Sequence, residues 1–144
     1  MVLDAGPLGV VSNPKDTAET AGWRTWLKDL TVNGVDIVVP AIADFEVRRE
    51  LVRAGKTRGI RYLNRVVADS HYAELTDIAL KLAAEFWATA RRRGVQTADD
   101  KALDADVILA AQAATLGVPT SEYVVATSTR RISRGSCRRS GGKR

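Results

Sequence analysis

The chain has 144 residues, of which 45% are apolar and 27% charged, a composition typical of one globular domain and unlike that of a disordered protein. It has no apolar run near the roughly 20 residues that a membrane-spanning helix needs, and its start lacks the basic region of a secretory signal. We therefore expect a cytoplasmic protein without membrane association. A single cysteine, Cys137, and a single histidine, His71, exclude a disulfide framework and zinc sites built from several Cys or His ligands.

The net charge of +5 comes from the C-terminal end of the chain. Residues 129–144 hold seven of the 22 basic side chains and none of the 17 acidic ones. The 15 basic and 17 acidic residues that remain give residues 1–128 a charge of −2. Because residues 129–144 are also poor in apolar side chains, we expect a folded domain over 1–128 followed by a basic, disordered tail.

The first predicted elements are a strand and a helix. Residues 2–3 predict a buried strand that ends at Asp4 and is followed by a turn. Residues 14–33 predict a helix in two pieces broken at Gly22. The apolar face of this helix is formed by Trp23, Trp26, Leu27 and Leu30.

The middle of the chain repeats this alternation. Residues 35–40 predict a second buried strand, and residues 41–54 and 59–68 predict helices. A short strand is predicted within 71–75. In the helix over 41–54, the side chains that we expect to face inward are Ile42, Phe45 and Leu51.

The last elements complete an α/β pattern. Residues 76–93 predict a helix with Thr76 as its N-cap, 97–101 a polar loop, 103–116 an alanine-rich helix, and 123–127 a strand. Strands that alternate with helices predict a three-layer α/β/α sandwich with a mainly parallel central sheet. The tryptophans that we expect in its core are Trp23, Trp26 and Trp87.

Four acidic residues stand at the ends of predicted strands or the starts of predicted helices, namely Asp4, Glu46, Asp104 and Asp106. The carboxyl ends of parallel strands meet at one edge of a sheet. Two carboxylates about 4 Å apart repel by roughly 4 kcal/mol at an effective dielectric near 20, so such a group needs protonation or a cation. Oxygen-only ligands suit Mg²⁺ or Mn²⁺. The alternative is that single acids here form turns or helix caps, above all Asp104.

Three segments together resemble the PIN-domain family, and within it the VapC-type toxins of toxin–antitoxin pairs. The matching segments are V-L-D-A-G-P-L at 2–8, A-D-F-E at 43–46 and D-A-D-V-I-L-A-A-Q-A at 104–113. The resemblance implies a PIN-like fold and a ribonuclease that uses Mg²⁺ or Mn²⁺, with Asp4, Glu46 and Asp106 as catalytic, metal-binding carboxylates. It implies Asp104 as a further candidate ligand. It also implies RNA as the substrate, a small antitoxin as a partner, and a homodimer.

The resemblance ends after V-V-A-T at 124–127. The family usually continues with Asp or Asn, where this chain has Ser128, so a fourth acidic or amide ligand is missing. Residues 129–144, back-translated with permitted codons and read in another frame, can encode an ending like that of the family. The nucleotide sequence would decide whether the tail is translated out of frame.

A basic stretch over 48–65 directly follows Glu46, and its candidate nucleic-acid-binding residues are Arg48, Arg49 and Arg53. These side chains could contact RNA phosphates or simply form a solvated helix face.

Two other functions stay open. One is a catalytically weakened PIN domain that binds RNA or protein, which the missing fourth ligand favours. The other is an unrelated α/β domain with an acidic pocket, such as a phospho-acceptor receiver. The lack of a paired acid beside Asp4 and of a lysine near the last strand disfavours it.

Overall fold

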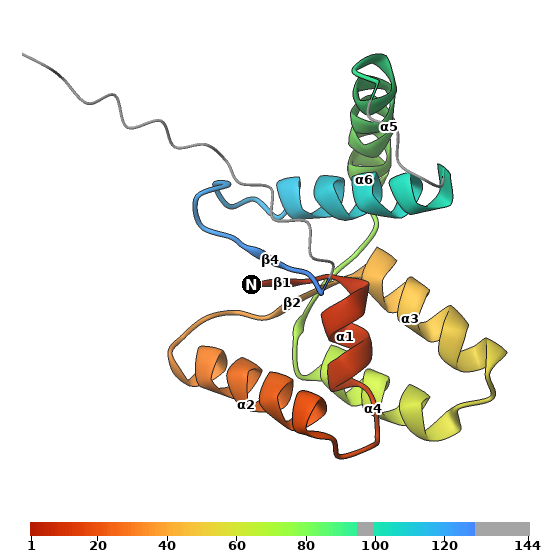
Figure 1. The fold of residues 1–144 in the computed structure, drawn as a ribbon. Coiled ribbons are helices and arrows are strands. Elements are labelled where there is room, and N and C mark those ends of the chain that lie inside the picture. Colours follow the sequence, from red (N-terminus) through yellow and green to blue (C-terminus); the bar gives the residue numbers. More distant parts are fainter. Residues whose placement is uncertain (95–99, 129–144) are drawn as a thin grey trace, which may run out of the picture.

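The computed structural model describes residues 1–94 and 100–128. The tail predicted over 129–144 and most of the loop predicted over 97–101 lie outside these residues. Within them the chain forms an α/β fold with six helices and a parallel sheet of four strands, as the alternating pattern predicts (Figure 1). The helices are α1 (Ala5–Val11), α2 (Ala18–Val32), α3 (Ala41–Arg53), α4 (Thr57–Ala68), α5 (Asp77–Arg92) and α6 (Asp100–Ala114).

The strands are short and stand in the order β3-β2-β1-β4. Their bounds are β1 (Val2–Leu3), β2 (Val38–Pro40), β3 (His71–Ala73) and β4 (Val125–Ala126). Val2 is in register with Val38 on one side and with Val125 on the other. Every pairing is parallel, so the carboxyl ends of all four strands lie at the same edge.

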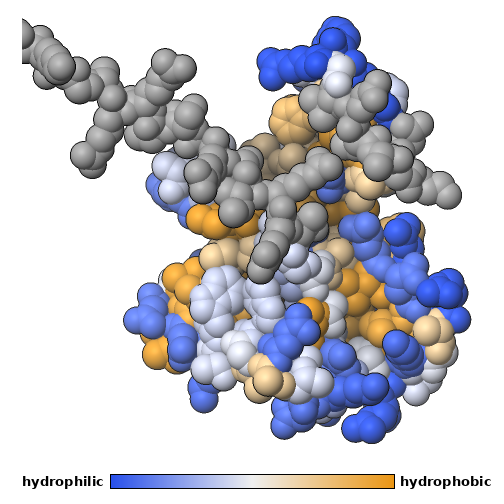
Figure 2. All heavy atoms as spheres, in the orientation of Figure 1, coloured by the Kyte–Doolittle hydropathy of each residue, from blue (hydrophilic) through white to orange (hydrophobic). Residues whose placement is uncertain are grey.

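Alternate side chains of the strands build two cores, one on each face of the sheet. Leu3 and Val39 are fully buried and pack with residues of α1, α3 and α4. Val2 and Val38 point to the opposite face, where Ala113 of α6 covers them. Helix α5 packs against α6 as an outer element. The result is a three-layer α/β/α arrangement, whose outer surface over α3 and α4 is largely hydrophilic with apolar patches between (Figure 2).

Two predictions about the N-terminal half were wrong. Helix α1 begins directly after Asp4, where the sequence predicted a turn. Pro7 is tolerated because the backbone N–H groups of a first helical turn have no partner within the helix. Helix α2 runs through Gly22 without a break, because one exposed glycine costs a helix only about 1 kcal/mol.

Three aromatic residues predicted to face the core are exposed. Phe45 is 57% exposed, and Trp26 and Trp87 are more than one-third exposed.

The capping prediction was right, because the Thr76 hydroxyl accepts a hydrogen bond from the Ala79 backbone N–H at 3.1 Å. No helix in the described part of the chain has the length and apolar character that crossing a bilayer requires.

Candidate functional site

The candidate site lies at the sheet edge where the strand order changes direction. The chain proceeds from β1 outward to β2 and β3, and then returns to β4 on the other side of β1. Open parallel sheets bind ligands at the carboxyl ends of strands, at the point where the order reverses. Here that point lies between the ends of β1 and β4.

Asp4 is the first residue after β1 and the N-cap of α1. Its Oδ1 accepts a hydrogen bond from the Ala5 backbone N–H at 2.7 Å. The cap satisfies one N–H of the helix terminus and holds the carboxylate where the helix dipole favours a negative charge. The transition from strand to helix therefore places this acid at the edge of the sheet.

Glu46 lies on α3, which begins immediately after β2. Its carboxyl pKa is raised above the ordinary value of 4.5, chiefly because burial penalises the charge. The nearby Arg49 guanidinium opposes this shift, while the charges of Asp4 and Asp106 raise the pKa further. The charges of Asp4 and Asp106 therefore lie near enough to Glu46 to affect its ionisation.

Asp104 lies on another side of α6 from Asp106. Two positions along a helix correspond to a rotation of about 200°, so the two side chains leave it in nearly opposite directions. Asp104 borders a hollow that Leu80 and Trp87 of α5 also line. It is not among the charges that act on Glu46. Of the other three predicted acids, Asp4 and Asp106 thus act electrostatically on Glu46, and Asp104 does not.

Ser128 follows β4 and lies against Gly6, in the first turn of α1. A Cβ atom at Gly6 would overlap the Ser128 hydroxyl, and it would lie 3.0 Å from the Ser128 Cβ. Only glycine lets the two segments approach this closely without a shift of Ser128. The position at which the resembled family has Asp or Asn therefore stands close to Asp4 at the same sheet edge.

The three predicted nucleic-acid-binding arginines each contact acidic residues of α3. Arg48 donates to Asp44 at 2.8 and 3.3 Å and to Asn64 of α4 at 2.9 Å. Arg53 donates twice to Glu50, at 2.7 and 2.9 Å. The Arg49 guanidinium lies 3.9 Å from a carboxylate oxygen of Glu46 and 3.9 Å from one of Glu50. Arg49 is thus the arginine that the structure brings beside the carboxylates.

The donor chemistry of Asp4, Glu46 and Asp106 suits a hard divalent cation, since all their ligating atoms are oxygens. In residues 1–94 and 100–128, however, no three His, Cys, Asp or Glu side chains are grouped closely enough to hold a metal ion. The charges are concentrated at one edge without forming a closed coordination shell.

Two polar residues that support this edge were missed in the sequence. Gln112 of α6 is buried; its side-chain amide donates to the Ala73 carbonyl at 2.7 Å and accepts from the Ile42 N–H at 3.0 Å. Asp44 binds Arg48 in the network described above. The i,i+4 spacing of Asp44 and Arg48 could have indicated their pairing, whereas no local pattern indicates the partners of Gln112.

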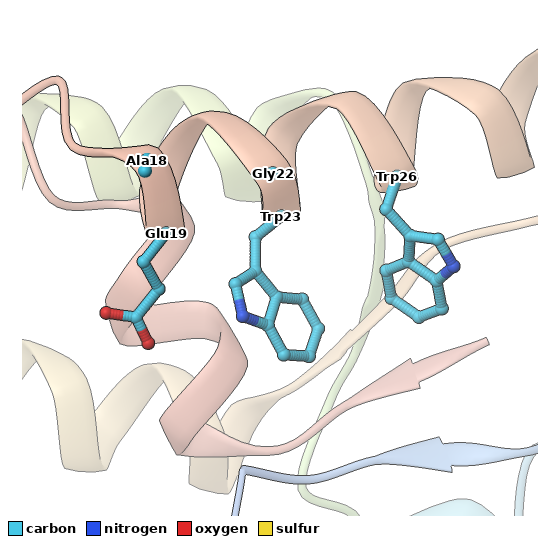
Figure 3. A pocket seen from close by; sticks show the side chains of 5 residues that line it. All are labelled: Ala18, Glu19, Gly22, Trp23 and Trp26. Atoms are coloured by element: carbon cyan, nitrogen blue, oxygen red, sulfur yellow. The ribbon is translucent and has the colours of Figure 1, made fainter.

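An apolar hollow of about 370 Å³ lies elsewhere, on α2 (Figure 3). Trp23 and Trp26 meet there edge to face, with ring centroids 5.3 Å apart. The residues that line it are Ala18, Glu19, Gly22, Trp23 and Trp26. Asp4, Glu46 and Asp106 do not border it.

Comparison with known proteins found no matching family model, no matching curated protein and no matching solved structure.

Proposed function

We propose that the chain is a metal-dependent endoribonuclease of the PIN-domain type and the toxin of a VapC-type toxin–antitoxin pair. The observation that supports this most is electrostatic: the charges of Asp4 and Asp106 both raise the pKa of Glu46. An acid whose ionisation is penalised by two other carboxylates fits a site that works with a bound cation.

In this proposal Asp4, Glu46 and Asp106 hold Mg²⁺ or Mn²⁺. When bound, such an ion would supply a lowered pKa for water and would neutralise charge on a phosphodiester. The Asp4 carboxylate is oriented by its cap on α1, and Arg49 balances part of the negative charge beside Glu46. Arg48, Arg49 and Arg53 lie on the same helix as Glu46, from which they would position RNA phosphates.

The remaining partners are proposed from the resemblance alone. They are a small antitoxin that blocks the site and a second copy of the chain, with RNA in the cytoplasm as the target. Co-purification with a co-expressed candidate antitoxin and measurement of the molar mass in solution would test both partners.

Cleavage of RNA in Mn²⁺ tests the nuclease proposal directly. We expect the wild type to cleave, and Asp4→Asn, Glu46→Gln and Asp106→Asn each to lower the rate by at least about 100-fold, the scale on which single catalytic groups act. Asp104→Asn is the matched control, because it removes the same charge from another face of the same helix. It is expected to cleave like the wild type. Equal cleavage by all variants would reveal a contaminating nuclease.

A second candidate function is a binding module derived from a PIN domain. Ser128 stands at the sheet edge without a carboxylate, and the three acids do not form a closed ligand group in the described residues. A wild type that binds RNA or a protein partner, but does not cleave RNA at any Mg²⁺ or Mn²⁺ concentration, would favour this function.

A further inference from the structure

Phe45 is the most exposed aromatic side chain in the described part of the chain, with 57% of its surface accessible. It lies on α3 directly before Glu46, where the sequence predicted a core position. The core side of α3 is formed instead by Ala43, Val47 and Leu51, which contact the main apolar cluster. Phe45 is therefore not needed to fill the interior, and its ring faces solvent beside the candidate site.

Arg49 contacts both the Phe45 ring and the Glu46 carboxylate. Its guanidinium carbon lies 5.5 Å from the Phe45 ring centroid, and one guanidinium nitrogen lies 3.9 Å from a Glu46 carboxylate oxygen. Phe45 and Arg49 are four positions apart, so both project from the same side of α3. An aromatic face, a planar cation and an acid thus follow one another across a single helix surface. Figure 2 shows this mixture of apolar and strongly hydrophilic surface over α3.

An accessible aromatic ring beside a planar guanidinium has the chemistry for stacking on a nucleobase. Bases stack on aromatic rings and on arginine whatever their sequence, because every base has a π-face. A base inside a duplex already has both faces covered by its neighbours, so only an unpaired base can use such a surface. The nearby arginines add attraction to the backbone of the same strand.

We propose that Phe45 and Arg49 form a stacking subsite for an unpaired base, so that the chain binds single-stranded RNA next to its carboxylates. The inference deepens the proposed nuclease function, on which its choice of RNA rests. The competing occupant is an apolar protein surface. Val52 distinguishes a stacked base from an apolar occupant. It lies on the same helix and is 61% exposed, but its side chain has no π-face on which a base could stack.

The test measures binding by the full-length protein in EDTA, so that cleavage does not interfere. Fluorescein-labelled single-stranded RNA and the same RNA in a duplex are titrated and followed by anisotropy. We expect Phe45→Ala and Phe45→Leu to weaken single-strand binding about tenfold, equivalent to ~1.4 kcal/mol, and to leave duplex binding unchanged. Phe45→Trp should preserve binding, and Val52→Ala should bind as the wild type does.

Several results would overturn the subsite. One is single-strand binding that is the same in Phe45→Leu and the wild type. Another is a weakening of RNA binding that Val52→Ala shares equally, which would show that apolar area on α3, and not the π-face of Phe45, contributes the affinity. A wild type that fails to bind single-stranded RNA would also overturn it.

Cleavage assays in Mn²⁺ separate this inference from the nuclease proposal. If the wild type cleaves RNA while Phe45→Leu binds it normally, the subsite is wrong and the nuclease stands. If binding depends on the ring but no cleavage occurs, the subsite stands and the nuclease is wrong.

Discussion

The Glu46 carboxyl is subject to opposing influences: burial and the charges of Asp4 and Asp106 raise its pKa, and Arg49 lowers it. The net result is a pKa above the ordinary value of 4.5. An acid whose pKa is raised by folding contributes stability that is fully present below its unfolded pKa. That contribution disappears as the pH rises through the folded pKa, because the folded state then has to hold a penalised charge.

We therefore expect Glu46→Gln to lose less thermal stability than the wild type when the pH of an EDTA buffer is raised from about 4.5 to 7. Mn²⁺ at pH 7 should raise the melting temperature of the wild type and have little effect on the variant. Differential scanning fluorimetry measures both. Glu50→Gln, one turn further along α3, controls for removal of a negative charge. Parallel pH profiles for wild type and Glu46→Gln would contradict the cause assigned to the shift.

Ser128 offers a gain-of-function test at the same edge. Its contact with Gly6 places residue 128 beside the first turn of the helix that Asp4 caps. Ser128→Asp adds a carboxylate there, so it should destabilise the metal-free protein and tighten Mn²⁺ binding about tenfold, or ~1.4 kcal/mol. Isothermal titration calorimetry measures the affinity, with Ser128→Ala as the matched control. Unchanged Mn²⁺ affinity in Ser128→Asp would show that residue 128 does not reach the ion.

Among the elements, α6 connects the two sides of the site. It carries Asp106, covers one face of the sheet, and sends Gln112 between β3 and the start of α3. Pro40 precedes α3 and provides no side-chain cap, so the Gln112 oxygen takes over part of that role by accepting the Ile42 N–H. The position of Glu46 on α3 thus depends on a residue that is remote from it in sequence.

Gln112→Leu tests this connection. The substitution keeps a buried side chain of similar size but leaves the Ala73 carbonyl and the Ile42 N–H without their partner. We expect the free energy of unfolding to fall by about 2–4 kcal/mol, because two polar groups lose a buried hydrogen bond. Urea denaturation measures the change. Thr115→Ala, directly after α6, removes a hydroxyl that donates to the Ala111 and Gln112 carbonyls near the surface, so it should lower stability by only about 1 kcal/mol or less. A decrease in Gln112→Leu no larger than in Thr115→Ala would contradict the role.

The sequence predicted the element order well because its signals are local. Apolar runs marked β1 and β2, and Thr76 marked the start of α5. It missed α1, since Ala5, Gly6 and Pro7 together look like a turn, and packing of the helix on the sheet overrides that weak preference. Phe45 was misplaced for a related reason: helical periodicity identifies an apolar position without showing whether another element covers it.

The candidate site could be predicted only in part. Parallel topology predicts that Asp4 lies at the edge where α3 begins, and the charges of Asp4 and Asp106 do act on Glu46. The spacing of Asp104 and Asp106 already implies that their side chains leave a helix in nearly opposite directions, but which of the two faces Glu46 depends on how α6 packs. The distances between carboxylates depend on how α3 and α6 pack, and that is a long-range property that no local pattern contains.

At the scale of the whole molecule, charge is divided unequally along the chain. Residues 1–128 contain 15 basic and 17 acidic side chains, while residues 129–144 contain seven basic side chains and no acid. Within the first part, acids cluster at the sheet edge and several arginines pair with acids of α3. In the proposed function, long-range attraction for an RNA polyanion would therefore come mainly from the last 16 residues, which carry the excess positive charge.

This division predicts that the tail supports RNA affinity and not the chemistry of cleavage. In a full-length variant with all seven basic residues of 129–144 replaced by Gln, RNA binding should weaken and become less dependent on salt. The slope of log affinity against log salt should decrease by about 0.7 for each phosphate of a single strand that the tail no longer neutralises. Anisotropy titrations at several salt concentrations measure the slope, and single-turnover cleavage at saturating protein should be unchanged. An unaltered slope would mean that the arginines of α3 and α4 supply the electrostatic attraction instead.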